Sequence, residues 1–178
     1  GEADRLAIAK RSVEQQRHRL ERVLAQDRDD QAGDDEGSRQ VDRRQQRQVE
    51  IDRAKRQAVF TVKAPTGTQP STVDAIVAAG ANWYPLAMAR QLDDAILHMR
   101  TNELDIGTWL WKTSGDSAAV QAMDAVLQAN QGHWLVRESA GLLRRTLSRI
   151  DVSSRSLFAL IEEGSCFTGT FLEFALAC

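Results

Sequence analysis

The sequence predicts an α/β fold for residues 49–178, and three observations carry this prediction. Two short strand patterns come first, and then apolar runs of strand length alternate with stretches in which apolar residues recur every three or four positions. The run IGTWLWKT is compact and apolar, as in buried parallel strands. Strands that alternate with helices are typical of a parallel sheet with right-handed crossovers. With 178 residues and 42% hydrophobic residues, the chain is long enough for one domain with a core.

Residues 1–48 are unlike the remainder of the chain. They are rich in Arg, Gln and Asp and contain no aromatic residue, since the first one is Phe60. A weak apolar pattern over 4–25 suggests a helix, whereas 26–48 offers little side-chain surface to bury. We therefore expect a disordered segment or a linker. A coiled-coil or docking helix is less favoured because the heptads are not sustained, and a translation artefact of a GC-rich gene is the other alternative.

The first folded elements are predicted from their alternation, turns and caps. VEID and AVFTV read as strands with the polar RAKRQ between them, so we expect a hairpin. A loop with two prolines follows, and then Asp74 or Thr72 caps a short helix that ends at Gly80. A longer helix covers about 85–100, with Pro85 in its first turn. Its core side has apolar residues at helical spacing, namely Leu86, Ala89, Leu92, Ile96 and Met99.

The second half of the domain continues the alternation. After the IGTWLWKT strand, a helix is expected over 116–130, capped by Asp116 or Ser117. The segment HWLVRESAGLLRRTLSRI predicts a third helix with one apolar face. RSLFALIEEG then reads as a buried strand, and TFLEFALAC as the start of another helix. The apolar face of the third helix comprises Trp134, Leu143, Leu147 and Ile150.

Composition argues against several functional classes. The formal net charge of −2 creates no field that would attract nucleic acid or an anionic membrane. No apolar run approaches the roughly 20 residues that a membrane span needs, and the first residues do not resemble a signal peptide. Cys166 and Cys178 form no metal-ligand spacing. We therefore expect reduced thiols and a cytoplasmic protein.

Most polar residues that could carry chemistry are better explained as surface residues. His98 and His133 have no Cys, Asp or Glu at ligand spacing, so no metal site is predicted. Arg144 and Arg145 could reach a phosphate, but on an amphipathic helix such side chains are more often exposed. The sequence contains no nucleophile elbow, phosphate-binding glycine loop or dinucleotide fingerprint.

The closing segment, EEGSCFTGTFLEFALAC, holds the strongest candidate site. An apolar strand that ends in a small-residue turn directs the first N–H groups of the next helix to one point, where a polarised carbonyl oxygen can bind. If that oxygen gains negative charge during a reaction, the same donors form an oxyanion hole. Glu173 lies about one helical turn after Gly169 and could act there as a general acid or base. A surface glutamate is the alternative, although Leu172 and Phe174 flank it.

Longer stretches resemble the crotonase (enoyl-CoA hydratase) superfamily. They are IDRAKRQAVFTVKAP, then ANWYPLAMARQLDDAILHMRTNELDIGTWLWKTSGD, and then HWLVRESAGLLRRTLSRIDVSSRSLFALIEEGSCFTGTFLEFALAC. The resemblance covers roughly 49–178 and is strongest to lyases of aerobic aromatic degradation. It implies a crotonase-like ββα spiral, incomplete at the C-terminal end, that corresponds to the second of two crotonase-like halves of such a lyase.

The resemblance also implies an activity and a set of site residues. The activity would be that of a cytoplasmic carbon–carbon lyase of benzoate catabolism, which opens the ring of 2,3-epoxybenzoyl-CoA with water and releases formate. No metal or redox cofactor is implied, since the substrate itself carries coenzyme A. The implied partners are the first crotonase-like half and further copies in a homo-oligomer. By the superfamily pattern, the backbone N–H groups of Gly169 and Thr170 bind the thioester carbonyl, and Glu173 is catalytic.

Two features depart from that pattern. The glycine run before the glutamate is reduced to Gly169, and SGDSAAV replaces the loop that normally supplies the first N–H group. We therefore keep two hypotheses: a catalytic module, or a non-catalytic scaffold half that packs against a catalytic half or a dimer partner. The chain opens on Gly1 and stops inside a helical pattern, with the second glutamate expected beyond Cys178. We accordingly expect a fragment that is inactive alone.

Overall fold

The computed structural model describes residues 39–43 and 46–178, and the helix expected over 4–25 lies outside them. The described residues belong to one compact unit, Gly37–Cys178. Its strands are β1 (Arg39–Arg43), β2 (Arg47–Asp52), β3 (Gln57–Lys63), β4 (Thr108–Ser114) and β5 (Ser156–Ala159). Its helices are α2 (Val73–Ala79), α3 (Tyr84–Thr101), α4 (Ser117–Ala129), α5 (Trp134–Asp151) and α6 (Leu172–Leu176), with the 3-10 turns η1 (Gly80–Asn82) and η2 (Gly169–Phe171).

The described strands form one sheet in the order β1-β2-β3-β4-β5. The first three pair antiparallel, whereas β3, β4 and β5 pair parallel. The predicted α/β class, the hairpin and the parallel strand at IGTWLWKT are thus confirmed. The domain boundary expected after residue 48 falls inside β2, and β1 precedes it. Hydrogen bonding of the backbone to a neighbouring strand brings this polar stretch into the sheet, and such pairing leaves no apolar signal in the sequence.

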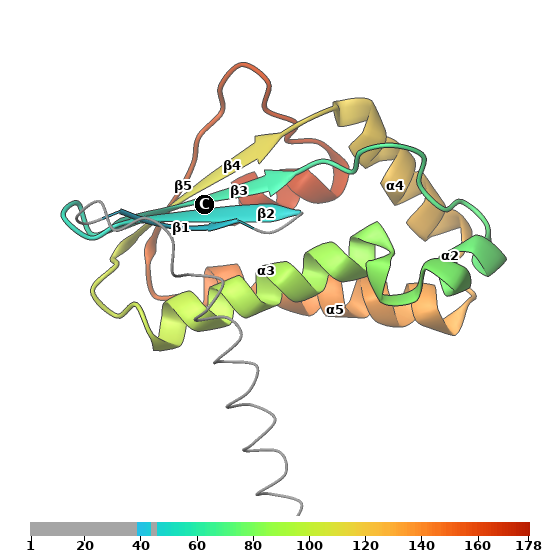
Figure 1. The fold of residues 1–178 in the computed structure, drawn as a ribbon, viewed down its shortest axis with the longest axis horizontal. Helices are drawn as coiled ribbons and strands as arrows, with labels where there is room; N and C mark the ends of the chain where they lie inside the picture. Colours follow the sequence, from blue (N-terminus) through green and yellow to red (C-terminus); the bar gives the residue numbers. More distant parts are fainter. Residues whose placement is uncertain (1–38, 44–45) are drawn as a thin grey trace, which may run out of the picture. The chain divides into compact units, whose positions relative to one another are not determined.

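Helices cover one face of the sheet. Figure 1 shows α3 and α5 side by side on that face, and these two helices pack closely against each other. In the described part of the chain, buried and partly exposed residues alternate along β3 and β4. The face of the sheet away from the helices is therefore only partly covered. The residues of β2, β3 and β4 that face the helices are buried: Val49, Ile51, Ala58, Phe60, Val62, Trp109, Trp111 and Thr113.

The helix boundaries follow the capping residues. Thr72 accepts a hydrogen bond from the backbone N–H of Ala75 at the start of α2, and Gly80 ends that helix. Asp116 accepts one from the N–H of Ala118 at the start of α4. The structure therefore decides between the alternative caps in favour of Thr72 and Asp116.

Two predictions about burial are wrong. Trp134 is 60% exposed, although Leu143 and Ile150 on the same predicted face are buried. Helical periodicity gives the direction of a side chain but not how far along the helix its packing partners extend. The strand expected to be buried, β5, has only four residues and alternates between exposed and half-buried, with Phe158 53% exposed. Phe158 aligns with Val59 and Leu110 on the face of the sheet away from the helices, so its side chain does not meet the core.

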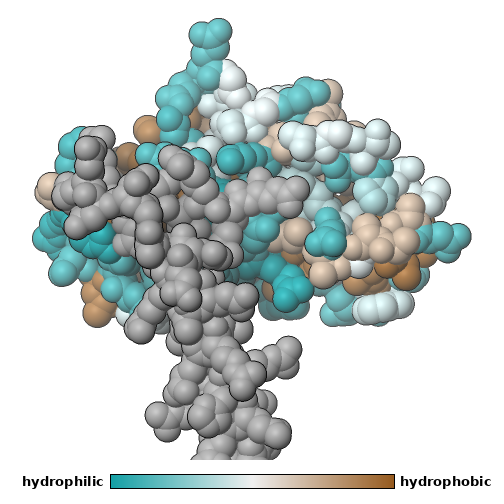
Figure 2. Space-filling model, in the orientation of Figure 1, coloured by the Kyte–Doolittle hydropathy of each residue, from teal (hydrophilic) through white to brown (hydrophobic). Residues whose placement is uncertain are grey.

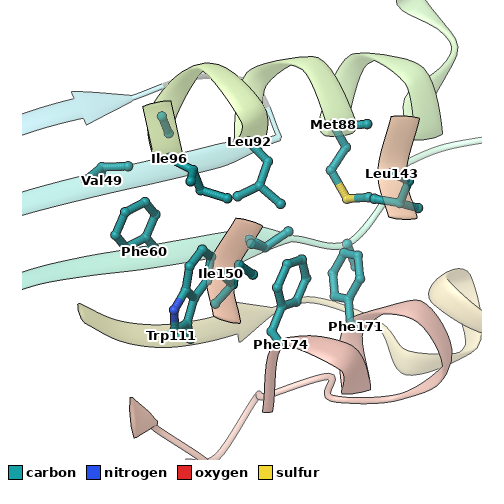
Figure 3. Close-up of a cluster of buried hydrophobic side chains, with 14 of the residues drawn as sticks. Val49, Phe60, Met88, Leu92, Ile96, Trp111, Leu143, Ile150, Phe171 and Phe174 are labelled. Atoms are coloured by element: carbon teal, nitrogen blue, oxygen red, sulfur yellow. The ribbon is translucent and has the colours of Figure 1, made fainter. Parts of the chain in front are cut away.

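A stack of aromatic rings lies at the centre of the core (Figure 3). Phe60 of β3 stacks on Trp111 of β4, with ring centroids 4.4 Å apart. Trp111 in turn stacks on Phe174 of α6 at 5.4 Å, with an angle of 6° between the ring planes. Phe171 meets the edge of Phe174 at 5.7 Å. The stack therefore joins the two central strands to the closing helix.

A buried arginine fastens β2 to α3. Arg47 is 2% exposed, and its Nε donates a hydrogen bond to the backbone carbonyl of Gln91 at 3.0 Å. Its Nη2 lies 3.6 Å from Oδ2 of Asp94. The backbone N–H of Gln46 donates to Oε1 of the same Gln91 at 3.2 Å. A buried charge requires such partners, so these contacts fix where the helix crosses the hairpin.

Phe174→Ala is expected to lower the free energy of unfolding by about 3–5 kcal/mol, because it removes a fully buried ring from the stack. Leu172→Ala on the same short helix serves as the control, because Leu172 is 42% exposed and its truncation leaves the stack intact. Urea denaturation followed by tryptophan fluorescence measures both variants. Equal losses for the two would contradict the central role of the stack.

Candidate functional site

The candidate segment follows β5 and crosses the end of β4 before it enters α6. The backbone N–H of Leu160 donates to the carbonyl of Trp111, and this hydrogen bond continues the pairing of β5 with β4. Further on, the N–H of Cys166 donates to Oγ1 of Thr113 at 2.9 Å. Cys166 is buried, and burial raises the pKa of its thiol. Two separate contacts with β4 therefore hold the loop before the turn begins.

Gly169 has a backbone conformation that only glycine adopts easily. Its φ of +48° lies in the left-handed region. A Cβ atom at this position would clash with Oδ2 of Asp124, a half-buried residue of α4. The glycine is thus required both by the turn and by the close approach of a carboxylate.

The same carboxylate binds Thr170 twice. The backbone N–H of Thr170 donates to Oδ2 of Asp124 at 2.7 Å, and its hydroxyl donates to Oδ1 at 2.5 Å. Beside them, Nε2 of Gln121 donates to Oγ1 of Thr168 at 3.1 Å. The N–H group that was expected to bind a carbonyl oxygen is therefore already paired with an anion of this chain.

Glu173 points in another direction. It is exposed and lines a cavity of about 200 Å³ between α5 and α6. Phe171 and Phe174 face the core, and a residue next to Phe174 on the helix is rotated by about 100° from it. Glu173 therefore has to lie outside the core. The other lining residues are Arg144, Leu147, Ser148, Asp151, Leu176 and Ala177.

The three predicted site residues thus do not line one cavity. Gly169 and Thr170 meet α4, whereas Glu173 looks toward α5. Their roles in binding and catalysis stay predictions. Asp124 was missed by sequence reasoning; its only signal is a carboxylate directly beside the buried residue Met123 in the apolar pattern of α4.

The remaining candidates, His98, His133 and Arg144, lie on helices or directly before one. His98 is exposed and lies 3.0 Å from the amide of Asn102, and His133 directly precedes α5. Arg144 lines the cavity of Glu173.

Across residues 39–43 and 46–178, no group of His, Cys, Asp and Glu side chains is arranged to hold a metal ion. Within the same residues, none of the helices is both long and apolar enough to cross a membrane.

A comparison with known proteins supports the expected resemblance. The chain is 57% identical over 127 residues to a benzoyl-CoA-dihydrodiol lyase of Aromatoleum evansii. The match covers 71% of this chain but only 23% of the relative, so the chain spans less than a quarter of the lyase that it matches. No protein-family model matches the chain. The expected resemblance to a lyase of aromatic degradation is therefore confirmed as a match to one part of a longer protein.

Gly169→Ala is expected to destabilise the domain by about 2–4 kcal/mol, because it adds a clash with Asp124 to the cost of a left-handed backbone. Gly164→Ala is the matched control, since Gly164 also has a positive φ, +82°, but a Cβ there meets nothing within 4 Å. Thermal unfolding of both variants measures the difference. If the Gly164 variant loses as much stability as the Gly169 variant, the close approach of Asp124 is contradicted.

Proposed function

We propose that this chain is part of a CoA-thioester lyase that opens the ring of 2,3-epoxybenzoyl-CoA with water and releases formate in aerobic benzoate degradation. The observation that carries the proposal is the 57% identity over 127 residues to a protein named benzoyl-CoA-dihydrodiol lyase. The match accounts for most of the chain. We also propose that the domain is a crotonase-like ββα spiral and the second such half of the lyase.

Glu173 is the proposed proton-transfer residue of this segment. A carboxylate beside a thioester can protonate a leaving oxygen or guide a water molecule. Its exposed position on a cavity leaves it free to meet a substrate, with Arg144 lining the same cavity. For the amide of Thr170 to bind the thioester carbonyl, Asp124 would have to release it, because one N–H group cannot serve both acceptors at full strength.

The Asp124–Thr170 contact also favours the second candidate role. A module whose proposed carbonyl-binding amide is paired with its own carboxylate fits a scaffold that shapes the pocket of the other half without reacting itself. In both cases the proposed substrate is a CoA thioester, and no resident metal or redox cofactor is proposed.

The proposed partners are the remainder of the lyase polypeptide and further copies in a homo-oligomer. The face of the sheet away from the helices supports the first of these. Strand register aligns Val59, Leu110 and Phe158 in one apolar row across β3, β4 and β5. Phe158 is 53% exposed, and Ile161 just beyond the strand is 76% exposed. On the side of the molecule seen in Figure 2, polar surface predominates and apolar surface gathers mainly at the right-hand end, near α2.

Glu173→Gln in a full-length lyase that carries this segment should lower kcat at least about 100-fold if Glu173 transfers a proton, because the amide cannot exchange one. Glu163→Gln is the control, since Glu163 is an exposed glutamate of the preceding loop. Release of formate from the epoxide of benzoyl-CoA measures turnover. Near-normal turnover of the Glu173 variant would support the scaffold role and exclude the catalytic one.

A further inference from the structure

The turn before α6 is held by polar contacts from α4. Both carboxylate oxygens of Asp124 are used, one by the N–H group and one by the hydroxyl of Thr170. Gln121, about one helical turn earlier, adds the contact to Thr168. We name these three α4-to-turn hydrogen bonds the α4 clamp. Charge-assisted hydrogen bonds of this kind are short and directional.

The apolar contacts of α6 differ from the α4 clamp in kind. Phe171 and Phe174 bury the inner side of the helix, and the Phe174 ring lies flat on Trp111. Hydrophobic burial is strong but non-directional, so it keeps the helix on the sheet without fixing its exact rotation. α6 has only five residues, too few to hold its own orientation through backbone hydrogen bonds.

Glu173 lies between these two anchors. It follows Thr170 by three positions and precedes Phe174 by one. A small rotation of the η2–α6 unit about the Phe174 contact would move the Glu173 carboxylate along the cavity wall while the ring stayed buried. The directional contact of Asp124 with Thr170 therefore sets where the carboxylate points.

From this geometry we propose that Asp124 is a positioning residue for the lyase reaction, which acts by fixing the direction of Glu173 through Thr170. This inference rests on the proposed function and adds to it a residue of α4 that neither contacts the cavity nor resembles a known site motif. Asp124 is not among the residues that line the cavity of Glu173, so its effect on turnover has to pass through the turn.

The test compares Asp124→Ala and Asp124→Asn in the full-length lyase. Removal of the carboxylate should lower kcat at least 10-fold and leave KM within about twofold, because a misdirected proton-transfer group weakens the transition state more than substrate binding. Asparagine keeps an oxygen that accepts the Thr170 N–H, so Asp124→Asn should recover most of the lost kcat. Asp74→Ala is the matched control, since Asp74 is an exposed aspartate of another helix.

A double-mutant cycle separates positioning from general destabilisation. In the Glu173→Gln background, Asp124→Ala should lower kcat by less than twofold, because the group that it positions no longer transfers protons. A further 10-fold loss in that background would overturn the inference. So would a normal kcat for the Asp124→Ala variant while Glu173→Gln is impaired. A normal kcat for Glu173→Gln, in contrast, would refute the proposed catalytic role itself.

Folding is controlled independently of activity. All assays are run at a temperature where thermal unfolding shows each variant to be folded. If Asp124→Ala does not fold, Thr170→Val replaces it in the cycle, because valine keeps the shape of threonine and removes only the hydroxyl contact with Oδ1. A smaller loss of kcat that again vanishes in the Glu173→Gln background supports positioning. An unchanged kcat for Thr170→Val, or a loss that persists in the Glu173→Gln background, overturns it.

Discussion

The stack of Phe60, Trp111 and Phe174 is the contact on which the rest of the domain depends. It joins two parallel strands, which are adjacent in space but separated in sequence by α2 and α3, to the last helix of the chain. Because large aromatic rings supply much of the buried area in a core, the loop between β5 and α6 is drawn over the end of β4 by this contact. Core packing therefore places the candidate site, and the site residues lie in the loop and helix that this packing holds over β4.

The aromatic stack does not determine the direction of the Glu173 side chain, and polar contacts do. Burial of Phe171 and Phe174 keeps Glu173 outside the core, but an apolar contact cannot specify the direction of its carboxylate. The carboxylate of Asp124 supplies that direction through two hydrogen bonds to Thr170. The same contact makes a glycine necessary at this position, because Gly169 has to admit the approaching oxygen and has a positive φ.

The sequence predicted the fold well because most of its elements have a local signal. Strand alternation, helical spacing and capping residues correctly placed the hairpin, α3, β4, α4 and α5. Features that depend on partners distant in sequence were missed. The polar segment of β1 enters the sheet through backbone pairing, and Phe158 of β5 is exposed because it lies on the face that the helices do not cover. Asp124 could not be recognised, because the sequence around a helical aspartate does not show whether its carboxylate binds water or the amide of a threonine 46 residues away.

The relative directions of the predicted site residues depend on the local form of the closing turn. The spacing from Gly169 to Glu173 suggested one shared face, which holds for a regular helix that begins at the glycine. The chain instead makes a 3-10 turn over Gly169–Phe171 and only then an α-helix, so the angle between the glycine and the glutamate differs from that of a continuous helix. The tighter turn aims the Thr170 amide at α4 and Glu173 at α5. An amide and a carboxylate that reacted on the same thioester from these positions would need a substrate that reaches around α6, or a partner that supplies the missing donor.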